Sequence, residues 1–486
     1  MAHFLLLAYH MPGHINPALQ FAQRLIHAGA RVTFLTTVYA YRRMIKSTPP
    51  EGLSYATFSD GYDDGPSPTA DLAELMAQFR QHGSEALADL MRTLANERRP
   101  VTCVVYTLLL QWAADVARSL NTPNVLLWIQ PATVFAIYYH YFHGYDDLIV
   151  KSIEKGPSSS IKLPGLPPLT SKELPSFIIP SASYVFMAAS FREQFERLDK
   201  EERPRVLINT FDEGEPDSIR AVDGVDQISV GPFFPPEFFD GKNLSHATDG
   251  GEMYKNSRNY IEWLDSKPAS TVVYVSFGSM VVLPNNQKVE ILNGLLESNR
   301  PFLWIIRPTE NGAGMNDETE FWEKVRMEME RKEGMVVPWC LQLEVLSHSS
   351  VGCFISHCGW NSTTESLAAG IPIVCLPCWT DQTSNAKLVE DIWKAGVRAK
   401  ANGEGVFEHG EVKRCLDLVM GEGGEGIRRN ALRWRQLARD AVREGGSSDQ
   451  NVRAFVMEMT GESGPRDCNG DVQKTNGERE RIDDEK

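Results

Sequence analysis

Short apolar runs rich in β-branched residues alternate with amphipathic helical patterns twice along the chain. The apolar runs predict buried strands, at residues 3–9, 31–36, 102–106, 124–129 and 206–209 in the first half, and at 272–277, 302–306, 335–337, 351–355 and 372–376 in the second. Helical patterns such as 17–28 and 111–119 lie between them. Alternation of this kind predicts parallel sheets covered by helices. We therefore expect an α/β fold with two doubly wound, Rossmann-like domains facing a cleft.

The stretch between the two alternating regions is rich in Pro, Gly, Asp and Asn and has no periodicity, which is typical of a linker. The end of the chain has almost no large apolar side chains, which is typical of disorder. We expect an N-terminal domain at 1–240, a linker at 241–256, a C-terminal domain at 257–445, a C-terminal helix at 446–460 that returns to the N-terminal domain, and a disordered tail at 461–486.

A chain of 486 residues is too long for one ordinary hydrophobic core, which agrees with two domains. Its net charge of −15 argues against a general binder of nucleic acids or anionic membranes, because neither would attract it. The N-terminus lacks the features of a signal peptide, and no stretch reaches the length of a membrane span. The eight cysteines have no metal-ligand spacing. We therefore expect a cytoplasmic protein with reduced thiols and no bound metal.

Two strand exits carry candidate chemistry, because ligands of doubly wound folds bind at the carboxyl ends of the strands. The first strand leaves through "MPGHINP" at 11–17, where we expect His14 on a loop and Pro17 in the first turn of the next helix. His14 suits a general base, although a histidine that only caps the helix fits equally well. Ser279 follows a glycine at the exit of the strand at 272–277. Neither a GxGxxG nor a Walker A sequence is present, so a dinucleotide site is poorly supported.

The decapeptide "HCGWNSTTES" at 357–366 joins an apolar strand directly to a helix. A helix N-terminus exposes unpaired N–H groups and the positive end of a dipole, which together favour a phosphate. Ser362 and Glu365 also fit S-x-x-E, a capping box that would merely close the helix end. These ten residues by themselves leave both interpretations open.

The longer stretch from Trp339 to Gln382 resembles the signature box of plant family 1 UDP-glycosyltransferases almost residue for residue. The resemblance covers nearly the whole chain and includes "GHINP", "WLDSKP", "FGS" and "EGGSS". Segments such as "SDGYDDG" and "VVYTLLLQWAADVAR" are most similar to the anthocyanin 5-O-glucosyltransferase group. The resemblance implies a GT-B fold and an inverting, metal-independent transfer of glucose from UDP-glucose to a plant phenolic, such as a flavonoid or anthocyanin. Glucose-ester formation on a carboxylic acid is the alternative, and a non-catalytic UDP-sugar-binding protein is a third possibility.

The resemblance also implies which side chains hold the donor substrate in the C-terminal domain. They divide into Trp339, Cys340, Gln342 and Glu365 at the nucleoside, Ser279, His357, Asn361 and Ser362 at the diphosphate, and Trp360, Asp381 and Gln382 at the sugar. Trp339 would stack on uracil, and Glu365 would bind the ribose hydroxyls. Gln382 matches the pattern associated with glucose, whereas a galactose-using relative would carry histidine there. No D-x-D triplet occurs, so the helix dipole and His357 would stabilise the leaving diphosphate.

By the same resemblance His14 is the catalytic base, which takes a proton from the acceptor hydroxyl. Most of the family places an aspartate beside this histidine, after the strand at 101–106, but Thr107 stands here. Asp115 is expected to be too distant to replace it. Threonine can orient the imidazole but cannot supply a charge, so we expect His14 to be a weaker base.

The acceptor-binding site is harder to predict from the sequence, because the main indication of it is a row of aromatic residues on one helix face. Phe135, Tyr138, Tyr139 and Phe142 form it, and they fit core packing as well as the wall of an acceptor pocket in the N-terminal domain. The expected partners are a small-molecule acceptor and a UDP-sugar, with no nucleic acid and no membrane span. We expect a monomer.

Overall fold

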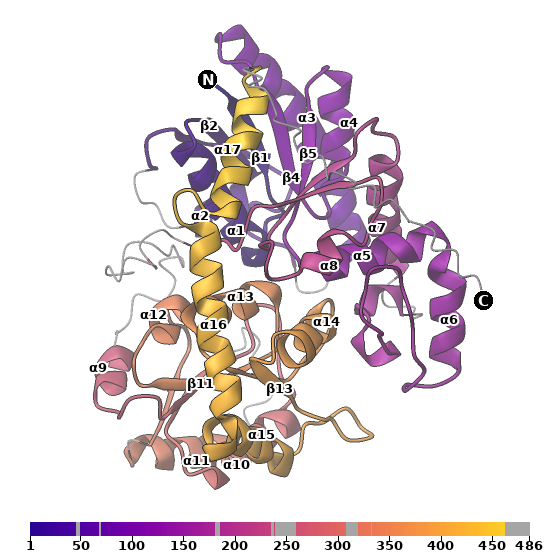
Figure 1. Ribbon diagram of the computed structural model, residues 1–486. Coiled ribbons are helices and arrows are strands. Elements are labelled where there is room, and N and C mark those ends of the chain that lie inside the picture. Colours follow the sequence, from indigo (N-terminus) through magenta and orange to yellow (C-terminus); the bar gives the residue numbers. More distant parts are fainter. Residues whose placement is uncertain are drawn as a thin grey trace, which may run out of the picture.

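Two parallel sheets organise the chain, one in each half of the molecule in Figure 1. The computed structural model describes residues 1–44, 49–67, 70–179, 185–234, 238, 259–307, 319–331 and 333–461. The expected linker at 241–256 and nearly all of the expected tail at 461–486 lie outside these ranges.

The first sheet has the strand order β3-β2-β1-β4-β5-β6-β7 and the second β10-β9-β8-β11-β12-β13. All the paired strands run parallel. The strands are β1 (His3–Leu7), β2 (Arg31–Thr37), β3 (Leu53–Phe58), β4 (Cys103–Thr107), β5 (Asn124–Trp128), β6 (Arg205–Ile208), β7 (Asp226–Ser229), β8 (Val272–Ser276), β9 (Phe302–Ile305), β10 (Gly334–Val337), β11 (Val351–Ser356), β12 (Ile373–Cys375) and β13 (Gly396–Arg398). This topology confirms the expected pair of doubly wound α/β domains.

Helices connect the strands and cover the sheets. They are α1 (Pro12–His27), α2 (Val38–Arg43), α3 (Leu72–Asn96), α4 (Trp112–Ser119), α5 (Ala132–His140), α6 (Asp146–Glu154), α7 (Val185–Leu198), α8 (Pro216–Ile219), α9 (Asn259–Asp265), α10 (Asn285–Glu297), α11 (Thr319–Glu330), α12 (Gln342–Leu346), α13 (Trp360–Ala369), α14 (Gln382–Lys387), α15 (His409–Met420), α16 (Glu425–Val442) and α17 (Ser447–Met459). Short 3-10 turns lie at Ser171–Glu173, Ser176–Ile178 and Glu422–Gly424, and π-helical turns at Tyr141–Tyr145 and Leu388–Ile392. None of the helices in the described part of the chain is both long and apolar enough to cross a membrane.

The strands that sequence reasoning missed are β3, β7 and β13, and each lies at the edge of its sheet. Central strands of a parallel sheet are covered on both faces, so they read as continuous apolar runs. All five residues of β1 are buried, whereas four of the six residues in β3 are not. The edge strands β3 and β7 therefore lack the apolar signal, and β13 has only three residues, whereas the fourth edge strand, β10, is apolar enough to be predicted.

Helix α1 begins at Pro12, five residues before the expected start. Pro12 occupies the first turn, where its missing N–H is not needed, and Pro17 lies inside the helix. The expectation that His14 sits on a loop is therefore wrong: it belongs to the first turn, where its N–H donates to the Met11 carbonyl at 2.9 Å.

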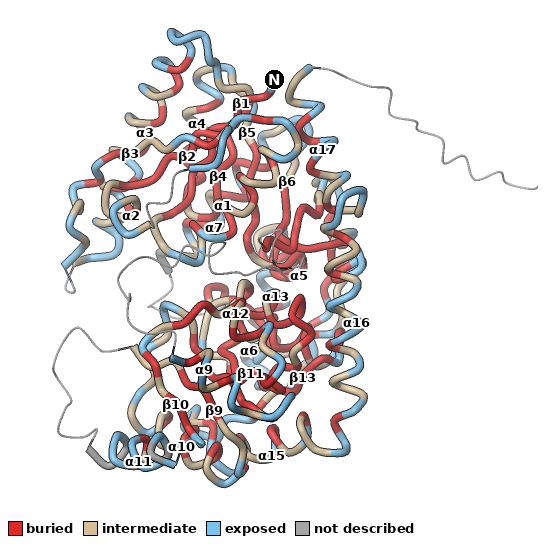
Figure 2. Tube along the Cα trace, turned by 90° about the vertical axis from the view of Figure 1, so that its left-hand side faces the viewer, coloured by how far each residue is buried: buried red, intermediate tan, exposed pale blue. Residues whose placement is uncertain are grey.

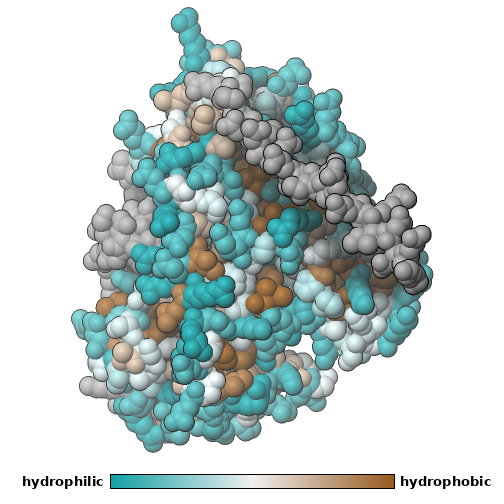
Figure 3. Space-filling model, viewed as in Figure 1, coloured by the Kyte–Doolittle hydropathy of each residue, from teal (hydrophilic) through white to brown (hydrophobic). Residues whose placement is uncertain are grey.

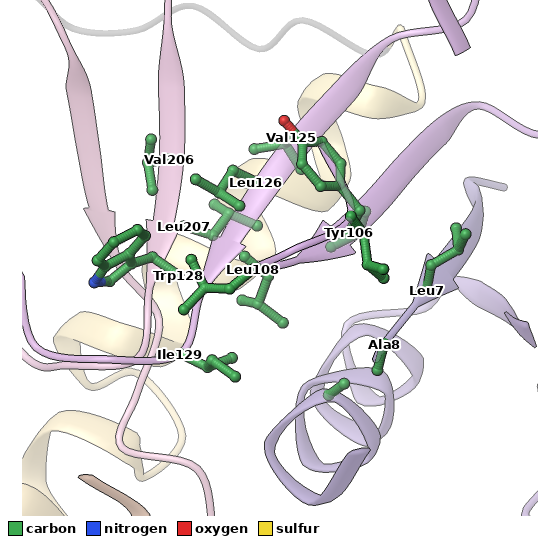
Figure 4. Packing of buried hydrophobic residues seen from close by; sticks show 14 of the residues in the cluster. Leu7, Ala8, Tyr106, Leu108, Val125, Leu126, Trp128, Ile129, Val206 and Leu207 are labelled. Carbon is green, nitrogen blue, oxygen red and sulfur yellow. The ribbon is translucent and has the colours of Figure 1, made fainter. Parts of the chain in front are cut away.

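Separate hydrophobic cores support the two sheets, as the buried segments in Figure 2 show. Figure 4 shows part of the first core, where Tyr106, Leu126 and Trp128 of β4 and β5 lie near Leu207 of β6. A further core crosses between the halves, because Phe211, which follows β6, packs with Trp360 and other residues of the second half. On the face in Figure 3 the described surface is mainly hydrophilic, with smaller hydrophobic areas.

The C-terminal helices run along both halves, α16 beside the second sheet and α17 beside the first (Figure 1). Ser448 Oγ donates to the Gly231 carbonyl at 2.5 Å, and Asn451 Nδ2 to the Ser229 carbonyl at 2.9 Å. The rings of Phe4 and Phe455 lie 5.4 Å apart. These contacts attach α17 to the first sheet.

Candidate active site

The strand exits of the two sheets meet at the start of α13. Asn361 Nδ2 donates to the Gly13 carbonyl of α1 at 3.2 Å. Trp360 Nε1 donates to the Asn209 carbonyl, just beyond β6, at 2.7 Å. The carboxyl ends of β1, β6 and β11 therefore face one another, and His14 comes within reach of the helix that follows β11.

His14 is held by Thr107, which lies level with it because β1 and β4 pair in register up to Leu7 and Tyr106. The distance from His14 Nδ1 to Thr107 Oγ1 is 3.3 Å, and Thr107 is fully buried. The Tyr9 N–H also lies 3.4 Å from this oxygen. Partial burial lowers the pKa of His14 well below its usual value, and the nearby His10 lowers it further.

Asp115 does not take the place of the missing carboxylate. Its Oδ2 accepts hydrogen bonds from Arg197 Nη2 at 2.5 Å and Nε at 3.0 Å. A second carboxylate near the site was not foreseen from the sequence: Asp60, which follows β3, is buried and raises the pKa of His10, although burial lowers that pKa more. His10 packs on Tyr9, with ring centroids 4.2 Å apart. No sequence motif marks either residue.

His357 lies at the exit of β11 between two glycines. A Cβ on Gly278 would come 2.7 Å from His357 Cε1, and one on Gly359 would come 2.5 Å from Nε2. Gly278 also has φ +68°, which disfavours other residues. His357 is 8% exposed, and its Nδ1 has no hydrogen-bond partner among the described residues. Burial lowers its pKa to about 4, so the imidazole is neutral at pH 7.

Helix α13 begins without a side-chain cap. Its N-cap is Gly359, which offers no side chain. Ser362 and Glu365 do not form the capping box that their spacing suggested, because α13 begins at Trp360 and Ser362 is therefore its third residue rather than its N-cap. Gln342 Nε2 instead donates to Ser362 Oγ at 3.0 Å and to Glu365 Oε2 at 2.6 Å. The first N–H groups of α13 thus remain available to an anion.

The residues expected at the nucleoside form one network. Tyr274 OH donates to Gln342 Oε1 at 3.1 Å and lies 3.3 Å from the buried Cys340 Sγ. Burial raises the pKa of Glu365 to about 7, although the hydrogen bond from Gln342 opposes this shift. Trp339 is half-buried. Its ring is therefore partly accessible for stacking.

The residues expected at the sugar are largely engaged with protein. The buried Trp360 indole packs against Trp393 at 5.9 Å, and its N–H is taken by Asn209. Asp381 accepts from Thr380 Oγ1 and Asn385 Nδ2, each at 2.7 Å. Gln382 Oε1 accepts the N–H groups of Cys378 at 2.9 Å and Trp379 at 3.0 Å. The indole of Trp360 is thus a contact between the two halves, and Gln382 fixes the loop before it.

Exposed Ser279 lies in the turn after β8, where Arg307 Nη2 donates to the preceding carbonyl of Gly278 at 3.0 Å. Arg307 was not foreseen from the sequence. Its charge also lowers the pKa of His357, less than burial does. It places a cation beside the expected diphosphate position.

The expected aromatic stripe runs from α5 into the π-helical turn at Tyr141–Tyr145, which holds Phe142, and only part of it is core. Phe135 and Tyr138 are fully buried, and Tyr138 stacks on Phe191 with centroids 4.4 Å apart. Tyr139 and Phe142 are only half-buried, and Tyr139 stacks on His143 at 3.9 Å. Core packing is thus the better account of the first two residues.

Comparisons with known proteins agree with this fold. The family model "UDP-glucoronosyl and UDP-glucosyl transferase" matches residues 243–440. The chain is 52% identical to a crocetin glucosyltransferase of Gardenia jasminoides, named as chloroplastic, over 93% of this chain and 96% of the relative. It is 47% identical to anthocyanidin 3-O-glucoside 5-O-glucosyltransferase 1 of Perilla frutescens, over 94% and 98%. Among solved structures, Os79 from O. sativa in complex with UDP superposes with a TM-score of 0.80 at 32% identity, covering 94% of this chain and all of that one.

Proposed function

This chain belongs to the family of UDP-glucoronosyl and UDP-glucosyl transferases, and from that premise we propose that it transfers glucose from UDP-glucose to a hydroxyl of a small plant phenolic. The observation that carries the proposal is the uncapped N-terminus of α13, which lies against the turn of α1 that contains His14. An anion site and a base thus lie on opposite halves of one molecule, as a displacement between two substrates requires.

The donor is held mainly by the second half. The N–H groups at the start of α13 bind the diphosphate together with Ser279, Asn361, Ser362 and the neutral His357. His357 Nδ1, which lacks a partner among the described residues, suits a phosphate oxygen. Trp339 stacks on uracil, and the network of Gln342 and Glu365 opens to the ribose hydroxyls.

The sugar lies between α13 and α14. The backbone N–H of Trp360, rather than its indole, faces the hydroxyls, because the indole is committed to Asn209. Asp381 and Gln382 complete the sugar site. The Gln382 amide nitrogen binds the sugar while its oxygen holds the loop at 378–379.

His14 acts on the acceptor. Thr107 Oγ1 accepts the N–H of Tyr9 and lies 3.3 Å from His14 Nδ1. We assign the proton of His14 to Nδ1, as a donor to Thr107, which leaves Nε2 unprotonated. Nε2 takes the proton of the acceptor hydroxyl as that oxygen bonds to the anomeric carbon on the face opposite the diphosphate. The bond from that carbon to the diphosphate oxygen breaks, UDP leaves with the electron pair, and an α-linked donor becomes a β-glucoside.

Charge on the departing UDP is stabilised by the α13 dipole and backbone without a metal ion. Within the described ranges no three His, Cys, Asp or Glu side chains gather into a group that could hold one. Arg307 adds a positive charge beside Gly278. We therefore propose that transfer proceeds without a metal ion.

A flavonoid or anthocyanin is the acceptor we propose. One relative is named for an anthocyanidin 3-O-glucoside, and the first half offers the partly exposed aromatic rings of Tyr139 and Phe142. A chain that carries both His14 and the donor residues needs no partner subunit, so we propose a monomer. All seven cysteines in the described ranges are free, which supports a cytoplasmic location.

The test is transfer from UDP-[14C]glucose to a panel of phenols and matched aromatic acids, with UDP-galactose as the control donor. We expect β-glucosides of phenols, no loss of turnover in EDTA, and little activity from His14→Ala. UDP binding without transfer to any acceptor would contradict the proposal, and loss of turnover in EDTA restored by magnesium would contradict the metal-free site.

A further inference from the structure

Helix α1 carries a proline where a helix normally excludes one. Pro17 is buried in its interior, alongside Ala18, Phe21 and Ala22. Any of these apolar residue types would fill the position and keep the helical N–H. Proline instead removes an intrahelical hydrogen bond and crowds the preceding turn. A residue that destabilises its helix at a buried position is expected to have a compensating role.

The lost hydrogen bond identifies that role. In a regular helix the N–H of residue 17 would donate to the carbonyl of residue 13, four positions earlier. Proline has no N–H, so the Gly13 carbonyl lacks this donor. Asn361 Nδ2 donates to that carbonyl from the first turn of α13, at 3.2 Å. The gap in α1 is thus filled from the other half of the molecule.

This hydrogen bond joins the two sides of the reaction proposed above. Gly13 directly precedes His14, the base, and Asn361 directly precedes Ser362, which we assign to the diphosphate. The neighbouring hydrogen bond from Trp360 to the Asn209 carbonyl is buried, and Trp360 belongs to a hydrophobic core. The hydrogen bond from Asn361 to Gly13 is exposed, so a change in α1 can remove it while that core stays intact.

We propose that Pro17 is a positioning residue: it leaves the Gly13 carbonyl open for Asn361 and so holds the turn of His14 in line with the N-terminus of α13. This inference rests on the proposed function. A displacement requires base, anomeric carbon and leaving oxygen in line, and a misplacement of about 1 Å costs up to about a hundredfold in rate. Loss of this alignment should therefore lower kcat and leave the affinity for UDP unchanged.

The decisive variant is Pro17→Ala, which returns an N–H to the Gly13 carbonyl and competes with Asn361. We expect kcat to fall between about threefold and a hundredfold, with the Kd of UDP unchanged within about twofold and no fall in Tm. Pro17→Val, which also restores the N–H but keeps more bulk, should behave alike if alanine leaves a cavity. Gln23→Ala, on the same helix two turns away, should keep the wild-type kcat.

A double-mutant cycle separates the hydrogen bond between Asn361 and Gly13 from other effects of Pro17. Asn361→Ala alone should lose kcat and, because Asn361 is also assigned to the diphosphate, some UDP affinity. Adding Pro17→Ala should lower kcat no further, because the hydrogen bond to Gly13 is already gone. A folded Pro17→Ala variant with wild-type kcat would overturn the role of Pro17, as would an equal loss in both backgrounds. Absence of transfer by the wild-type enzyme would instead contradict the proposed function itself.

Discussion

At the residue scale, the base of this enzyme has unusual neighbours. Thr107 orients His14 through an uncharged contact, and partial burial and His10 both lower the pKa of His14. A low pKa leaves the imidazole unprotonated at neutral pH, so it is ready to accept a proton. The same low pKa weakens its pull on that proton, since basicity and pKa fall together. Acceptors that ionise easily should therefore suit the site best.

Thr107→Asp tests this conclusion. The carboxylate should raise the pKa of His14, and turnover should rise more on a phenol with a pKa near 10 than on an aromatic acid near 4, which arrives ionised. Because the reaction needs unprotonated His14, kcat/KM rises with pH through its pKa, and the variant should shift this limb to higher pH. The gain is a share of the roughly 100- to 10,000-fold effect of a general base.

Thr107→Asn supplies the uncharged control, and melting curves report the cost of a buried carboxylate. Equal effects on both acceptor classes would separate Thr107 from the basicity of His14.

Gln382→His tests the sugar end of the site. Gln382 Oε1 accepts two backbone N–H groups of the loop at 378–379, and an imidazole cannot accept both. We expect kcat/KM for UDP-glucose to fall by about tenfold, the size of one lost hydrogen bond, and the preference over UDP-galactose to narrow. Gln382→Glu keeps the acceptor oxygen and removes the amide N–H groups, so it separates the loop from the sugar contact. Unchanged kinetics with both donors in Gln382→His would remove residue 382 from the sugar site.

At the element scale, the central strands and the motif at 339–382 could be predicted, because their signals are continuous in the sequence. Three of the four edge strands could not, since β3 and β7 leave most of their residues unburied and β13 has only three residues. The start of α1 was missed because Pro17 is a normal first-turn residue and only the contact with Asn361 explains it inside the helix. The capping box was predicted wrongly because α13 begins two residues before Ser362, which places Ser362 inside the first turn instead of at the N-cap.

Gly278→Ala tests how the β8 exit supports His357. The new Cβ would come 2.7 Å from the imidazole, and the backbone there has φ +68°. The ring must shift away from the diphosphate position, so we expect UDP affinity to fall by at least about tenfold, the size of one hydrogen bond to a charged group. Gly410→Ala is the matched control, because it lies in α15 with open space around it. Calorimetric titration with UDP checks both variants, and wild-type affinity in Gly278→Ala would dissociate His357 from the diphosphate.

At the scale of the whole molecule, the two halves are joined by more than the donor helix. The segment at 173–178 packs in the core of the first sheet through Leu174 and Phe177, yet its polar groups bind the second half. Glu173 Oε1 accepts from Lys387 Nζ at 3.1 Å and from Arg398 Nη1 at 2.8 Å. The Ser176 N–H donates to the Thr380 carbonyl at 2.9 Å, next to Asp381. No sequence motif predicts the role of this segment, because its hydrogen bonds to the second half join residues that are far apart in the sequence.

Glu173→Gln should loosen this junction. The Glu173 side chain is 9% exposed, but Lys387 and Arg398 keep ion pairs with Asp391 and Glu390. Loss of the hydrogen bonds to this carboxylate should therefore cost about 1.5–3 kcal/mol of unfolding free energy. Burial would raise the pKa of Glu173, but hydrogen bonds from Arg398 and Lys387 outweigh burial and hold it below the usual 4.5. A carboxylate with a lowered folded pKa stabilises fully above its unfolded pKa, and this contribution disappears as the pH falls through the folded value. Urea unfolding should therefore separate variant and wild type at pH 7, and the gap in unfolding free energy should shrink as the pH falls below the unfolded pKa and disappear below the folded one. Asp64→Asn, in an exposed pair with Arg42, should leave the midpoint unchanged. A gap of the same size at every pH would show that Glu173 stabilises the junction by shape rather than by charge.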